Sequence, residues 1–166
     1  MRGGGNMSKI HFIDTSVLSE LLNIPGMNDR HSIAKQEYQE LVRNGDTFIL
    51  PVAVLVETGN HIAHIANGNS RRSIAKKFTA IAQKAIKMED NWSVTPEIPR
   101  HILEVIVNQF PDQAVAETGF GDLSIIAQFN DYWENRQPIG EMRIWSYDSH
   151  LSGYIHIGGL SRRKNK

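Results

Sequence analysis

Short apolar runs alternate with helix-length segments along this chain, and that alternation is what most restricts its fold. Strands are predicted at residues 9–13, 46–50, 92–95 and 142–148, with an edge strand at 154–157. Helices are predicted at residues 16–22, 30–45, 51–66, 71–87 (with Ser70 as its N-cap), 99–110 and, after a glycine-marked loop, in the later part of 117–136. Strands separated by helices need crossover connections, which give an α/β fold with a mainly parallel sheet flanked by helices. In such sheets, ligands bind beyond the carboxyl ends of the strands.

Composition is that of an ordinary globular domain. The chain has 166 residues, of which 40% are apolar and 22% charged, enough for one sizeable core. It contains no cysteine, which excludes disulfides and thiolate zinc sites and is compatible with the cytoplasm. No apolar stretch approaches the roughly 20 residues that cross a bilayer. The 18 basic and 18 acidic residues cancel, so net charge indicates no partner. We expect one domain at 9–157, between a leader at 1–8 that lacks a signal-peptide core and a flexible basic tail at 158–166.

Four acidic residues are predicted to meet at the carboxyl ends of the strands. Asp14 follows the first strand, and Asp148 stands at the end of the last clear one. Glu57 lies two turns into the helix after the second strand, and Asp122 begins a helix on its apolar face. Each has an ordinary alternative as a helix cap, a solvated side chain or a turn residue. Packed together without a counter-charge, however, the carboxylates would repel one another, and Mg²⁺, which prefers carboxylate oxygens, would remove that cost.

Four segments that carry these acids, "FIDTS", "VLVETGNHIAH", "GFGDLSIIA" and "RIWSYD", together resemble the PIN-domain ribonuclease family. That family includes the toxins of many bacterial type II toxin–antitoxin pairs. The resemblance implies a PIN-like three-layer α/β/α fold and an endoribonuclease that depends on Mg²⁺ or Mn²⁺. It also implies RNA as substrate, with an antitoxin protein or a second copy of the chain as candidate partners. The implied catalytic and metal-binding residues are Asp14, Glu57, Asp122 and Asp148, supported by Ser16 and Ser146.

The chain departs from the family pattern in three places. Ser146 stands where a threonine is common, a change that keeps the hydroxyl. The segment between Glu57 and Asp122 is longer than in compact toxins, and the chain ends in basic residues. The last two differences bear on the toxin role more than on nuclease chemistry.

Candidate contacts to the RNA backbone lie on the basic side of the helix at 71–87. They are Arg72, Lys76, Lys77, Lys84 and Lys87, and a solvated helix face explains the same pattern equally well. His61 and His64 share a helical stripe with Glu57 and are further candidates.

Three other interpretations remain open. Glu57, His61 and His64 have the spacing of a transition-metal site, although that site would leave the three aspartates unexplained. Asp14 as a phosphoryl-accepting nucleophile lacks a convincing second aspartate or hydroxyl pattern beside it. A PIN-like module that binds RNA or protein without cleavage would have little use for four carboxylates.

Overall fold

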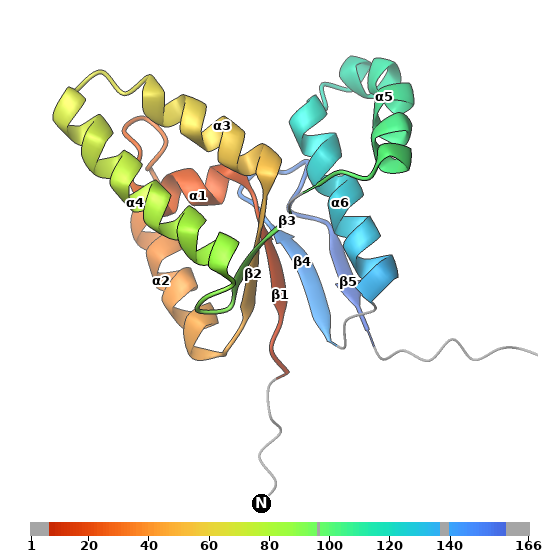
Figure 1. The fold of residues 1–166 in the computed structure, drawn as a ribbon, viewed down its shortest axis with the longest axis horizontal. Helices are drawn as coiled ribbons and strands as arrows, with labels where there is room; N and C mark the ends of the chain where they lie inside the picture. The colour runs from red at the N-terminus through yellow and green to blue at the C-terminus, as the bar shows by residue number, and fades with distance from the viewer. Residues whose placement is uncertain (1–6, 96, 137–139, 159–166) are drawn as a thin grey trace, which may run out of the picture.

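A five-stranded sheet forms the centre of the molecule in the computed structural model, which describes residues 7–95, 97–136 and 140–158 (Figure 1). Its strands are β1 (Ile10–Ile13), β2 (Thr47–Pro51), β3 (Trp92–Thr95), β4 (Glu141–Trp145) and β5 (Ile155–Ile157). Their order is β3-β2-β1-β4-β5. The pairs β1–β2, β1–β4 and β2–β3 are parallel, and β5 is antiparallel to β4. The carboxyl ends of β1 to β4 therefore lie at one edge, which we call the rim.

Helices flank this sheet on both sides. They are α1 (Thr15–Leu22), α2 (His31–Arg43), α3 (Val52–Ala63), α4 (Gly68–Lys87), α5 (Arg100–Val115) and α6 (Phe120–Arg136). Helices α1 to α4 gather on one side in Figure 1, and α5 and α6 lie on the other. The predicted α/β fold with a mainly parallel, helix-flanked sheet is confirmed.

Alternation of side chains along the strands explains how the two sides are filled. On one face, Phe48 stacks on Trp92 and packs against Tyr38 of α2. On the opposite face, Phe12 contacts Phe129 and the ring of a tyrosine one turn further along α6. All of these strand residues are essentially buried, so both faces contribute to one core.

Several predicted element ends differ from the structure. Strand β4 ends at Trp145, three residues earlier than predicted, because the chain turns away from the sheet there. Helix α5 continues through Pro111 to Val115; it buries only Ile106, so water can satisfy the carbonyl that a proline leaves unpaired. The predicted Ser70 cap is wrong: α4 begins earlier, and the Asn67 side chain accepts a hydrogen bond from the Ser70 N–H (2.9 Å).

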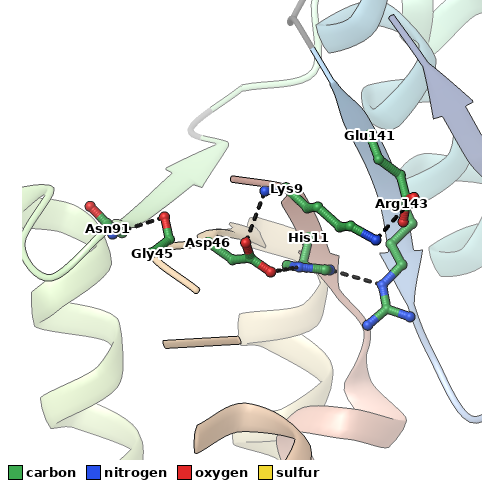
Figure 2. A network of polar contacts seen from close by, with 7 residues as sticks. All are labelled: Lys9, His11, Gly45, Asp46, Asn91, Glu141 and Arg143. Carbon is green, nitrogen blue, oxygen red and sulfur yellow. Dashed lines mark hydrogen bonds and ion pairs between the residues drawn. The ribbon is translucent and has the colours of Figure 1, made fainter. Parts of the chain in front are cut away.

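A buried polar network joins the strands at the end of the sheet opposite the rim (Figure 2). The Arg143 Nε–H donates to Nδ1 of His11 (2.9 Å), so the other ring nitrogen, Nε2, carries the proton and donates to Asp46 (2.8 Å). Asp46 also accepts from the backbone N–H of Lys9 (2.9 Å), and the Lys9 ammonium pairs with Glu141 (3.1 Å). Burial lowers the pKa of His11, which therefore stays neutral at pH 7.

Within the residues described, no helix is both long and apolar enough to cross a bilayer. The predicted leader and basic tail fall largely on residues 1–6 and 159–166, outside the described ranges.

Candidate active site

Asp14 lies at the rim directly after β1, where it is 4% exposed. One carboxylate oxygen, Oδ2, accepts hydrogen bonds from the Ser16 backbone N–H (3.3 Å), the Ser16 hydroxyl (2.7 Å) and the Ser146 hydroxyl (2.8 Å). The first of these bonds makes Asp14 the N-cap of α1. Helix capping, the ordinary alternative for this residue, is thus one of its roles in the structure. The described residues give no hydrogen bond to Oδ1.

The two predicted serines connect Asp14 to Asp148. The Ser146 hydroxyl, which donates to Asp14, accepts a hydrogen bond from the Asp148 backbone N–H (2.9 Å). The Ser16 hydroxyl lies 3.3 Å from that of Ser146 and accepts from the Tyr147 backbone N–H (3.0 Å). The register of the sheet explains this arrangement, because Ile13 pairs with Trp145 and the following residues leave the sheet side by side. The residues that directly follow β1 and β4 therefore form one hydrogen-bonded unit.

Glu57 joins this unit from α3. Its Oε2 accepts a hydrogen bond from the Thr15 hydroxyl (2.9 Å), and Oε1 lies 3.7 Å from His61 Nε2. The same Oε2 is 3.9 Å from the position that a Cβ would occupy at Gly121, so the first turn of α6 passes close to Glu57. Thr15 was missed by the sequence reasoning, although a second hydroxyl beside Asp14 in "FIDTS" was the available signal.

The pKa of Asp122 depends on the charges of the other three acids. Burial in the first turn of α6 raises its pKa, and the negative charges of Asp14, Asp148 and Glu57 raise it further, to about 6. The partial positive charge of a helix N-terminus would act in the opposite direction. Repulsion and desolvation win, as expected for carboxylates that share a site without a counter-ion.

The carboxylates do not enclose an ion as they stand. Among the residues described, no three His, Asp or Glu side chains are arranged as a ready-made metal site. That observation counts against the alternative of Glu57, His61 and His64: the exposed His64 instead bonds through Nδ1 to the carbonyl of Asn60 (2.7 Å). It bears less on Mg²⁺, which keeps several waters and needs only one or two carboxylates directly.

Some of the basic residues proposed to contact RNA line a hollow, and the others are exposed on the surface of α4. Lys77 and Lys84 line a hollow between α2 and α4, and Lys84 is ion-paired with Asp90 (2.7 Å). Arg72, Lys76 and Lys87 are exposed on α4, which lies on the outer side of its helix group, away from α6 (Figure 1). Four of the five residues are therefore exposed, and the fifth, Lys84, is already paired with a carboxylate.

Comparison of the chain with protein-family models, with curated proteins and with solved structures found no match. The residues of this chain, their geometry and the resemblance of their motifs are therefore what indicates a function.

Proposed function

We propose that this chain is a PIN-like endoribonuclease that hydrolyses RNA phosphodiester bonds with the help of Mg²⁺ or Mn²⁺. The observation that carries the proposal is the convergence of four carboxylates from four separate parts of the chain. Burial, together with the negative charges of the other three, raises the pKa of the fourth, Asp122, to about 6. A folded protein that retains such repulsion gains stability from any divalent cation that relieves it.

The residues fit such a cation chemically. All four donors are hard carboxylate oxygens, the kind that Mg²⁺ and Mn²⁺ prefer. Asp14 Oδ2 is held by three hydrogen bonds, which orients its other oxygen without occupying it. Asp14, Asp122 and Asp148 are the residues that would hold the ion, directly or through water, and Glu57 would hold a second ion or orient a water. Such an ion, when bound, would lower the pKa of a water molecule and stabilise negative charge on the leaving oxygen.

The chain's own groups then have distinct roles. Ser16 and Ser146 hold Asp14 and the Asp148 backbone in register, as outer partners of metal ligands commonly do. Thr15 donates to Glu57 Oε2 and leaves Oε1 available to accept a proton or a water hydrogen. No histidine is needed as a base, although His61 lies beside Glu57 and is the nearer of the two histidines proposed to contact RNA.

A protein partner of the antitoxin type belongs to the same proposal. The hollow between α2 and α4, about 450 Å³, supports it: the aromatic rings of Tyr38 and Trp92 lie among Lys35, Lys77 and Lys84. A hollow lined by apolar side chains and three lysines suits an acidic, amphipathic segment of another chain. A second copy of this chain remains the other candidate partner.

A non-catalytic PIN-like module that binds RNA or protein is the second candidate. Nothing about four adjoining carboxylates favours binding of an anion, since they repel phosphate groups. The electrostatics of the rim therefore favour the nuclease.

The test is incubation of the purified chain with mixed RNAs, with Mg²⁺ or Mn²⁺ or with EDTA, beside Asp14→Asn and Asp122→Asn. We expect cleavage that needs the metal and falls by on the order of 100-fold in each variant, equivalent to about 2.7 kcal/mol of transition-state stabilisation. Asp29→Asn, which removes an exposed carboxylate in the turn before α2, is the control.

Cleavage that survives EDTA would contradict the metal mechanism. RNA binding without cleavage, and without any rise in melting temperature on adding Mn²⁺, would identify the non-catalytic module instead.

A further inference from the structure

The segment that follows β4 is held from outside the rim by Glu37 of α2. One carboxylate oxygen of Glu37, Oε2, accepts hydrogen bonds from the Tyr147 hydroxyl (2.7 Å) and from the Trp145 indole N–H (3.2 Å). Both donors are separated from Glu37 by more than a hundred residues of sequence. Glu37 thus connects α2 to the chain immediately before Asp148.

Side chains along this segment alternate between two sets of contacts. Trp145 and Tyr147 bond to Glu37, whereas the intervening Ser146 bonds to Asp14 and to the Asp148 backbone. Tyr147 is held a second time through its backbone N–H, which donates to the Ser16 hydroxyl, and the Arg30 guanidinium lies 5.2 Å from the centre of its ring. The segment is therefore fixed from α1, from α2 and from the rim at once.

We propose that Glu37 is a positioning residue for Asp148: by holding Trp145 and Tyr147 on the α2 side, it keeps Ser146 and Asp148 turned toward the acidic rim. This inference rests on the proposed function, which gives Asp148 its role. Glu37 itself bonds away from the rim and is assigned no contact with metal or RNA.

The two hydrogen bonds are well suited to that role. An ionised carboxylate forms stronger hydrogen bonds than a neutral acceptor, and two donors on a single oxygen fix both side chains relative to α2. The Tyr147 hydroxyl is protonated at neutral pH, as tyrosine ordinarily is, and donates to this carboxylate. Removal of Glu37 would leave a buried indole N–H and a half-buried hydroxyl without their acceptor.

The experiment compares Glu37→Ala, Glu37→Gln and Tyr147→Phe with a control, Glu40→Ala. Glu40 is an exposed carboxylate one turn further along α2. Three quantities are measured for each variant: Mn²⁺ affinity by calorimetry, kcat and KM for RNA cleavage, and hydrogen exchange at the backbone amides of Tyr147 and Asp148. Melting temperatures show whether each variant is folded.

We expect Glu37→Ala and Tyr147→Phe to lower Mn²⁺ affinity and kcat by about 10-fold, as loss of outer partners of metal ligands typically does, with KM unchanged. Exchange at the two amides should accelerate in the same variants. Glu37→Gln keeps an acceptor oxygen and should restore most of both properties, and Glu40→Ala should match the unmodified chain. A merely structural role for Glu37 would lower the melting temperature without changing kcat or Mn²⁺ affinity.

The inference is overturned if folded Glu37→Ala and Tyr147→Phe exchange at the unmodified rate, or if they exchange faster with no change in kcat. Failure of the proposed function looks different, because the unmodified chain itself would then neither bind Mn²⁺ nor cleave RNA. In that case the exchange rates still decide whether Glu37 holds the segment.

Discussion

At the scale of single residues, Asp14 shows that one carboxylate can serve two purposes. Helix capping needs only an acceptor for a backbone N–H, and Oδ2 provides it while also accepting from two hydroxyls. The three bonds restrict rotation of the carboxylate without using the lone pairs of Oδ1. Capping and metal binding are therefore compatible at this position, and the cap improves the orientation that a ligand would need.

The raised pKa of Asp122 predicts how stability depends on pH. Its folded-state pKa, about 6, lies above the value near 4 of an unfolded aspartate, so the folded chain holds the proton more tightly. The contribution of Asp122 to the free energy of unfolding is therefore present below about pH 4 and is lost as pH rises to about 6. In EDTA, the melting temperature of Asp122→Asn, relative to that of the unmodified chain, should rise across this window.

Added Mn²⁺ provides the second half of that test. At pH 7 the ion should raise the melting temperature of the unmodified chain more than that of Asp122→Asn, because it relieves a repulsion that the variant has already lost. Equal pH profiles for the two proteins would show that neither burial nor the other three carboxylates raise the pKa of Asp122.

At the scale of secondary-structure elements, the rim is assembled by strand order and register. Pairing of β1 with β4 brings Asp14 beside Ser146, and the parallel β2 places the start of α3, and so Glu57, at the same edge. Helix α6 then delivers Asp122 in its first turn, next to Glu57. Asp14, Asp122 and Asp148 lie just after a strand or in the first turn of a helix, which is where parallel α/β sheets concentrate their binding residues, and Glu57 lies in the second turn of α3.

At the opposite end of the sheet, we expect substitution of the buried Asp46 to lower the free energy of unfolding more than substitution of an exposed aspartate. Two donors, the Lys9 N–H and His11 Nε2–H, face the two oxygens of Asp46, and an asparagine offers only one acceptor. Asp46→Asn should therefore lower the free energy of unfolding by about 2–3 kcal/mol, measured by urea denaturation at pH 7.5, where His11 is neutral.

The matched control is Asp90→Asn, which breaks the exposed ion pair with Lys84. Asparagine tolerates the left-handed conformation of that residue (φ 51°), and exposed pairs contribute less than about 1 kcal/mol. If the two variants lose the same free energy of unfolding, the hydrogen bonds of Asp46 stabilise the fold no more than an exposed ion pair does.

At the scale of the whole molecule, the exposed cations of α4 and the acids of the rim belong to different elements. The neutral net charge gives no sign of this arrangement. In Figure 1, α4 and α6 lie on opposite sides of the sheet, and Asp122 lies in the first turn of α6. The basic residues can then affect how strongly RNA binds without touching the bond that is cleaved.

That arrangement predicts a change in KM without a change in kcat. Arg72→Ala combined with Lys76→Ala should raise KM and reduce the dependence of log affinity on log salt by about 1.4, since each phosphate contact to single-stranded nucleic acid contributes about 0.7. Cleavage kinetics at several salt concentrations measure both effects.

Lys35→Ala combined with Arg43→Ala removes the same charge from α2 and serves as the control. If both double variants behave alike, the exposed side of α4 is only a solvated helix face.

The amino-acid sequence by itself determined the alternation of strands and helices, the mainly parallel sheet and the identities of the four acids that adjoin one another at the rim. These follow from local patterns: apolar runs, helical periodicity and residues at strand ends. Where local signals competed, prediction failed, as at the cap of α4, where Asn67 and Ser70 both had capping side chains, and at Pro111, which an exposed helix tolerates. Nuclease activity, the metal and the partners stay predictions.

Only the tertiary structure decided which groups contact the acids. The bond from Ser146 to Asp14 spans 132 residues, that from Thr15 to Glu57 spans 42, and that from Tyr147 to Glu37 spans 110. No local pattern encodes such pairs, because they depend on sheet register and on how α2, α3 and α6 pack. The elevated pKa of Asp122 has the same origin, since charges interact through space and not along the chain.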